Sequence, residues 1–152
     1  MKKLIVIFLL PLYSCSIPTL IHFTEDEKYI SVFDVPGTQN ELFLKANSWM
    51  IGIFKDPRNI IQHSDKEEGV LIGKYLLVSF PMTMSYTGAD VYGIIDIRVK
   101  DGKARLEIKP MDFREASNPW AVGGSSKQQV MDACAKMADD FLAEMTKGTV
   151  EF

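Results

Sequence analysis

Cysteine and histidine are the residue types best suited to nucleophilic, acid–base or metal chemistry, and the 152-residue chain has two of each. The histidines, His22 and His63, are too far apart in sequence and context to suggest a metal pair. His63 and Asp65 could form a dyad, but a histidine on the surface of a short strand is the favoured interpretation. We find no cluster typical of a catalytic or metal site, and we expect no cofactor.

Cys134 lies on a predicted helix, in one apolar stripe with Val130, Met137, Phe141 and Met145. A reactive thiol would need a basic neighbour or a helix N-terminus, and Lys136, two positions away, points off that stripe. We therefore predict that Cys134 is a small buried hydrophobic residue. A disulfide with Cys15 is the alternative, and acylation of Cys15 would remove it.

Two other segments are only loosely similar to ion-binding loops. Asp65, Glu67 and Glu68 lack the alternating oxygen ligands of a calcium loop, so a solvated turn is favoured. The sequence GGSS at 123–126 could hold an anion at a helix start, but it lacks the P-loop pattern of lysine and hydroxyl. A connector is favoured there.

The N-terminal residues have the three parts of an export signal: two lysines, an apolar stretch over 4–12, and a small residue before Cys15. The end of this segment, LYSC, resembles a bacterial lipobox, whose cysteine is diacylated before the signal is removed. A membrane-spanning anchor over 4–23 and an ordinary cleaved signal are the alternatives. We expect 1–14 to be a signal peptide, 15–27 a lipid-anchored tether and 28–152 a single domain.

The chain left after removal of the signal has 138 residues (152 − 14), which suits one domain with a modest core. It carries 15 basic and 20 acidic residues, a net charge of −5, once Lys2 and Lys3 are removed. Phosphate contacts dominate nucleic-acid affinity, so this acidic balance argues against a nucleic-acid partner. No acidic cluster follows Cys15, which favours the periplasmic face of the bacterial envelope over the cell surface.

Patterns of apolar residues predict one strand, a helix, four strands and a last helix. A capping box at Thr38 and Glu41 begins the first helix, which Asp56-Pro57 ends. The strands are expected at 28–35, 60–63, 70–80, 91–99 and 104–108, and the last helix begins near Ser126 and stops at Lys147-Gly148.

Asp101-Gly102 predicts a two-residue hairpin turn that sets Val99 opposite Ala104. The same register places like charges opposite each other on a wet face, Arg98 with Arg105 and Asp96 with Glu107. We expect these side chains to form diagonal pairs, Arg98 with Glu107 and Asp96 with Arg105.

Two apolar loops form the candidate contact surface. Met82, Met84 and Tyr86 lie in a proline-led loop between two strands, and Trp120 lies between the last strand and the last helix. Methionine and aromatic side chains on loops are typical of adaptable binding surfaces. The alternative is that both loops cover the open end of the core.

The succession of elements resembles a known family. Its features are a strand ending in Pro36-Gly37, a capped helix with Trp49, a strand pair around the GVLIG sequence at 69–73, and the KDGK hairpin at 100–103. Over about residues 28–146 it is similar to an uncharacterised envelope domain common in Bacteroidetes lipoproteins. The resemblance implies an α+β fold of TATA-binding-protein-like β-α-β4-α order, with an antiparallel sheet of about five strands and two helices on one face. It implies no catalytic residues.

We therefore expect a lipid-anchored envelope protein that works as a binding or interaction module, through its exposed sheet face and apolar loops. Its partner would be another envelope protein or a small ligand, besides the membrane. Two alternatives stay open: an envelope hydrolase with a carboxylate- or hydroxyl-based site, and a structural subunit of an envelope assembly.

Overall fold

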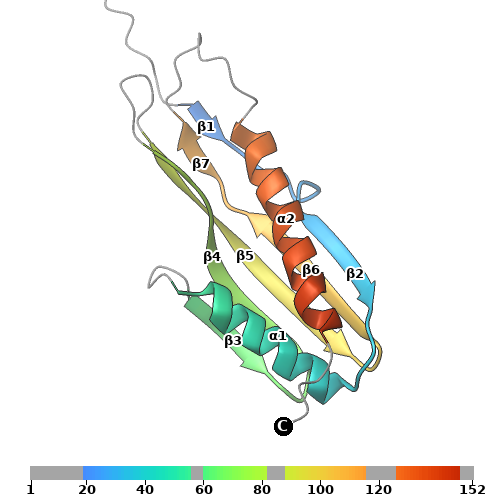
Figure 1. Ribbon diagram of the computed structural model, residues 1–152. Helices are drawn as coiled ribbons and strands as arrows, with labels where there is room; N and C mark the ends of the chain where they lie inside the picture. Colours follow the sequence, from blue (N-terminus) through green and yellow to red (C-terminus); the bar gives the residue numbers. More distant parts are fainter. Residues whose placement is uncertain (1–18, 56–59, 82–87, 116–125, 148–152) are drawn as a thin grey trace, which may run out of the picture.

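The computed structural model describes residues 19–55, 60–81, 88–115 and 126–147, in two helices and seven strands (Figure 1). The helices are α1 (Gln39–Ile53) and α2 (Ser126–Thr146). The strands are β1 (Thr19–Ile21), β2 (Tyr29–Asp34), β3 (Ile60–Asp65), β4 (Val70–Phe80), β5 (Ala89–Lys100), β6 (Lys103–Pro110) and β7 (Phe113–Glu115). None of the helices in this part of the chain is long and apolar enough to cross a membrane.

Five of the strands form one antiparallel sheet in the order β2-β6-β5-β4-β3. Both helices cover the same face of this sheet (Figure 1), and they contact each other there. Within the described ranges no helix or strand covers the other face, which we call the open face. The predicted α+β fold, with five antiparallel strands and two helices on one face, is confirmed.

Helix α1 begins where its sequence predicts. The Thr38 side chain accepts the N–H of Glu41 at 3.4 Å, and the Glu41 carboxylate accepts the N–H of Thr38 at 2.8 Å. These bonds satisfy backbone donors that the first turn leaves without helical partners. Farther along α1, Trp49 Nε1 donates to Asp140 Oδ2 at 3.0 Å, which fixes α1 against α2.

The β5–β6 hairpin supplies the centre of the core. Its register pairs Val99 with Ala104, Ile97 with Leu106 and Ile95 with Ile108, as the Asp101-Gly102 turn predicts. All six side chains are buried beneath the helices. The α2 stripe differs from the expected one at a single position, because Ala138 is buried where Met137 was expected and Met137 is only half-buried.

The expected tether contains structure from Thr19 onward. Strand β1 pairs with β7 in antiparallel register, and Phe23 is buried with Phe113 at a ring-centroid distance of 6.2 Å. Two three-residue strands are too short to show a periodicity, so the sequence predicted neither. Part of the segment that we expected to be a tether, from Thr19 to Phe23, therefore packs with the strand β7.

Candidate functional site

All five predicted site residues, namely Cys15, Met82, Met84, Tyr86 and Trp120, lie outside the described residues, and their roles stay predictions. The described elements that flank the two loops are nevertheless informative. The end of β4, the start of β5, the end of β7 and the start of α2 lie at one end of the molecule, where β1 also lies (Figure 1). The fold therefore attaches both predicted loops at the end of the molecule where β1, the first described strand, lies.

Cys134 is buried in the core, as predicted. Removal of the thiol from water disfavours its charged form, and burial raises the pKa of Cys134 to about 12. A thiol with so little thiolate at neutral pH is a poor nucleophile. Cys134 is therefore a packing residue.

The two histidines serve no common site. His22 Nδ1 lies 2.7 Å from Asp112 Oδ2 on the surface, and Asp112 also accepts the N–H of Phe23 at 2.9 Å. The backbone bond from Phe23 and then the His22 bond hold the pKa of Asp112 below its ordinary value. These contacts fasten the segment after β1 to the segment between β6 and β7.

His63 lies exposed on β3, and the hypothetical dyad with Asp65 is absent from the described contacts. The Asp65 carboxylate instead accepts the N–H groups of Glu67 at 2.9 Å and Glu68 at 3.0 Å, which closes the β3–β4 turn. No three potential metal-binding side chains gather in the ranges that the structure covers. The solvated-turn interpretation therefore fits this acidic segment.

The charged side chains on the open face pair along their strands and not diagonally as we expected. Arg98 Nη2 lies 3.0 Å from Asp96 Oδ2 on β5, and Arg105 pairs with Glu107 on β6. Lys28 Nζ also reaches Glu107, at 3.2 Å. Side chains two positions apart share a face, so each arginine finds its carboxylate on its own strand.

Glu107 is the acid around which these cations gather. Burial by itself would raise the pKa of Glu107, but hydrogen bonds from Arg105 and Lys28 outweigh that effect and lower the pKa. The Glu107 carboxylate therefore stays ionised beside its two cationic partners.

A groove of about 400 Å³ opens at the hairpin end of the open face. Four cationic side chains contribute to its lining, which comprises Val32, Gln39, Glu68, Arg98, Val99, Lys100, Lys103, Ala104 and Arg105. Three of these cations have carboxylate partners, because Arg98 pairs with Asp96, Lys103 with Asp34 and Arg105 with Glu107. With Glu68 beside them the charges nearly cancel, so the groove is no specific site for an anion.

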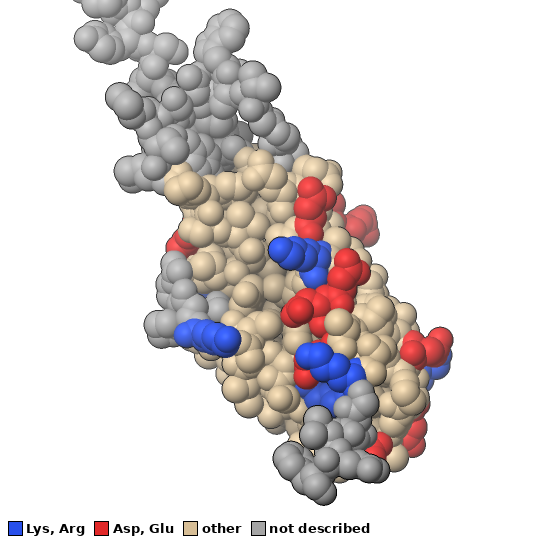
Figure 2. Space-filling view, viewed as in Figure 1, with Lys and Arg blue, Asp and Glu red and all other residues tan. Residues whose placement is uncertain are grey.

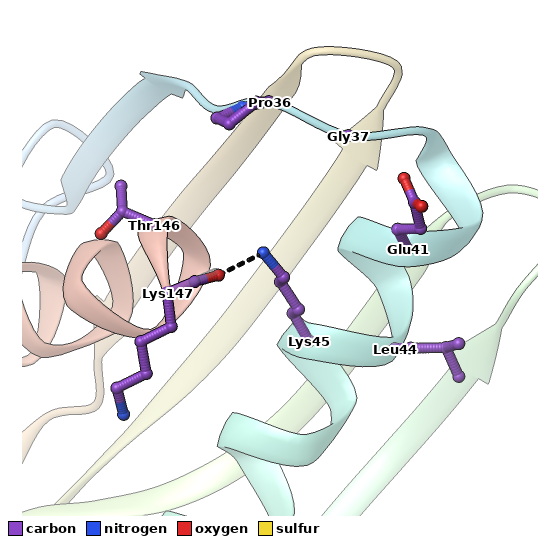
Figure 3. A pocket seen from close by; sticks show the side chains of 7 residues that line it. All are labelled: Pro36, Gly37, Glu41, Leu44, Lys45, Thr146 and Lys147. Carbon is purple, nitrogen blue, oxygen red and sulfur yellow. Dashed lines mark hydrogen bonds between the residues drawn. The ribbon is translucent and has the colours of Figure 1, made fainter. Parts of the chain in front are cut away.

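A second groove, of about 390 Å³, lies where the start of α1 meets the end of α2 (Figure 3). Lys45 projects into the space between the two helices, where its Nζ donates to the carbonyl oxygens of Lys147 at 2.7 Å and Met145 at 3.2 Å. A cation at a helix C-terminus satisfies carbonyl groups that have no helical partner. Lys45 therefore stabilises the end of α2.

Between its ion pairs the open face carries apolar side chains. Val32 is 61% exposed, Ile60 56% and Ile30 45%. Along β5, Tyr92 and Ile94 alternate with the buried residues and are half-buried on the open face, with Lys74 Nζ 4.4 Å from the Tyr92 ring centre. The opposite, helix-covered side shows acidic and basic side chains together in one band, beside a broad neutral surface (Figure 2).

The apolar outward face of β2, a strand that the sequence did predict, is the feature of this surface that sequence reasoning missed. Its sequence, YISVFD, is apolar on both faces, because Tyr29 and Phe33 turn toward the core while Ile30 and Val32 turn outward. A strand with one solvated face normally alternates apolar and polar residues. The signal was therefore present in the sequence, as an apolar pair where polar residues were expected.

Comparisons with known proteins agree with this architecture. A DUF4468 family protein from Bacteroides ovatus has a TM-score of 0.54 and 17% identity, over 82% of this chain and 89% of that one. A TBP-like protein from Parabacteroides distasonis has a TM-score of 0.56 and 13% identity, over 78% and 91% respectively. At such identities these similarities show the fold alone, and no curated protein matches the chain.

The sequence profile of one family matches residues 29–114, more than half of the chain. That segment runs from β2 into β7 and includes the whole five-stranded sheet and α1. The chain therefore belongs to the DUF4468 family, the domain of unknown function with a TBP-like fold.

Proposed function

We propose that this chain is a lipid-anchored protein of the bacterial cell envelope whose domain binds another envelope protein through the open face of its sheet. One observation carries the proposal: apolar side chains stand uncovered between ion pairs on a face that no described element covers. Exposed apolar patches with a polar surround are typical of interaction sites.

The short connection between Cys15 and β1 limits the distance of the domain from the membrane. Four residue steps separate Cys15 from Thr19, where β1 begins. Extended chain spans roughly 3.5 Å per residue, so a lipid on Cys15 would hold β1 within about 14 Å of the membrane. The described elements that flank the loops carrying Met84 and Trp120 meet at the end of the molecule where β1 lies (Figure 1), so the proposed anchor would bring that end to the lipid surface.

Membrane fractionation tests the anchor. Cys15→Ala should be exported but should leave the membrane fraction after a high-salt wash, because a single residue carries the lipid. A mutant that stays with the membrane and retains no uncleaved signal contradicts the anchor.

Site-specific photocrosslinking in cells tests the binding face. A photoreactive residue at Arg98, on the open face, should give an adduct with a second envelope protein. The same residue at Lys136, exposed on α2, is the matched control and should not. Equal labelling at both positions, or labelling at Lys136 alone, would contradict binding through the open face.

A further inference from the structure

Among the residues that the structure describes, strand β2 has a partner on one side only and so has one free edge. Its only hydrogen-bonded neighbour in the five-stranded sheet is β6, and Figure 1 shows it along one border of the sheet. A free edge presents a row of unpaired N–H and C=O groups, which another strand can extend. The edge is a different surface from the open face, although Ile30 and Val32 border both.

The two edges of the sheet are not equivalent. Strand β3, at the far edge, has a shift of register between Ile61 and His63, and such irregularities protect edges from pairing. Strand β2 pairs with β6 without interruption from Tyr29 to Asp34. Only β2 therefore offers a regular edge among the strands of this sheet that the structure describes.

The backbone direction of β2 identifies the groups that face outward. Val35 donates its N–H to the carbonyl oxygen of Gly102 at 3.0 Å, on the side of β6. Successive residues of a strand direct their backbone groups to alternate edges. The N–H and C=O groups of Ile30, Val32 and Asp34 therefore point away from β6, toward the free edge.

The sequence along this edge is complementary to itself. If a second copy runs antiparallel with Ser31 facing Ser31, then Ile30 faces Val32, Tyr29 faces Phe33 and Lys28 faces Asp34. Each position meets a suitable partner: apolar with apolar, aromatic with aromatic, and cation with anion.

The neighbouring registers are worse. Centring the pair on Ile30 sets Asp26 against Asp34, and centring it on Val32 sets Ile30 against Asp34. Both outcomes are unfavourable on an edge, because like charges repel and a charge gains nothing from an apolar neighbour. Complementarity thus selects Ser31 as the centre.

The charged residues at the two ends of β2, Lys28 and Asp34, already form ion pairs within one copy. Pairing about Ser31 would join these ion pairs across the two copies. Lys28 Nζ lies 3.2 Å from Glu107, and Lys103 Nζ lies 2.5 Å from Asp34. Facing Lys28 of one copy with Asp34 of the other produces a row of four charges that alternate in sign, from Glu107 to Lys103 of the second copy. Two such rows, one at each end, would flank the apolar centre.

We propose that two copies of this chain associate through β2, antiparallel about Ser31, and join their five-stranded sheets into one of ten strands. The two-fold axis is perpendicular to the sheet, as in other isologous dimers built on strand pairing. Because the two β2 strands run antiparallel, the ends that carry β1 lie at opposite ends of the joined sheet, on the same side of its plane.

Disulfide trapping in the full chain tests the register. Facing residues at a pair without mutual hydrogen bonds have Cα atoms about 4.5 Å apart, within reach of a disulfide. Ser31→Cys should form a covalent dimer on mild oxidation, whereas Ser64→Cys, exposed on β3, should not. The unsubstituted chain gives the background from Cys15 and Cys134. Equal trapping at both positions, or none at Ser31→Cys, would overturn the proposal.

A charge swap tests the same contact without a new thiol. Asp34→Lys sets lysine against Lys28 twice in the dimer, and should raise the dimer dissociation constant about tenfold or more in analytical ultracentrifugation. Adding Lys28→Asp to Asp34→Lys restores opposite charges and should restore the dimer. Circular dichroism confirms that each variant is folded. A monomeric parent chain, or a swap that fails to rescue a folded double variant, refutes the pairing.

The test separates this proposal from binding at the open face. Asp34→Lys should weaken self-association while the photocrosslink from Arg98 to a second envelope protein persists. Loss of that crosslink in a chain that still dimerises would count against the proposed function and leave the dimer standing.

Discussion

The thiol of Cys134 should be almost inert in the folded protein. The side chain is fully buried on α2, and burial raises its pKa from an ordinary value of 9.0 to about 12. Because the thiolate is the reactive form, a rise of this size lowers the reactive fraction near neutral pH about a thousandfold. Exclusion of the reagent from the core lowers the rate further.

Labelling with a chromogenic disulfide reagent measures this protection. The rate for the folded chain should be at least about a thousandfold below the rate in denaturant, and it should follow global unfolding as denaturant is added. The Cys15→Ala variant is the sample of choice, because it leaves Cys134 as the only thiol of the chain. Native labelling within tenfold of the unfolded rate would show that Cys134 is accessible, and the assignment to the core would be wrong.

Three stability measurements test other parts of the structure. Phe141→Ala should lower the free energy of unfolding by about 3–5 kcal/mol, because Phe141 is fully buried against Trp49 with ring centroids 5.0 Å apart. Leu44→Ala, at a residue 53% exposed, is the matched control and should change the free energy of unfolding little. Similar losses of stability in both variants would show that Phe141 is not a core residue. Thr38→Ala removes the side-chain acceptor of the α1 capping box and should cost about 1 kcal/mol in urea denaturation, whereas an unchanged midpoint would show that the cap contributes nothing. Met84→Ser should leave the melting temperature nearly unchanged if Met84 is a contact residue. Trp120→Ser should lower the free energy of unfolding by about 3–5 kcal/mol if Trp120 packs on the core. The reverse result would exchange the two assignments.

The candidate site residues show which functional features the sequence could predict and which it could not. The sequence identified Cys134 as a core residue, because helical spacing placed it on an apolar stripe, and the structure buries it. It gave no means to choose a partner for His22, because Asp112 lies ninety positions away. The contact residues Met84 and Trp120 remain sequence predictions.

Local chemistry determined most of the fold. The capping box at Thr38 and Glu41 set the start of α1, since both partners lie within one helical turn. The turn at Asp101-Gly102 set the register of β5 with β6, because a two-residue loop leaves one way to pair the strands. Each feature depends on residues close in sequence.

Only the tertiary structure decided what depends on distant neighbours. Strand β1 exists because β7, far along the chain, pairs with it, and neither three-residue strand has a periodic signal of its own. Lys28 reaches Glu107 because β2 lies beside β6, and the expected diagonal ion pairs are replaced by pairs along each strand. The strand order also leaves β2 at the border of the sheet. A strand's own residues specify its pattern of side chains, whereas the number of its neighbours depends on the packing of the whole chain.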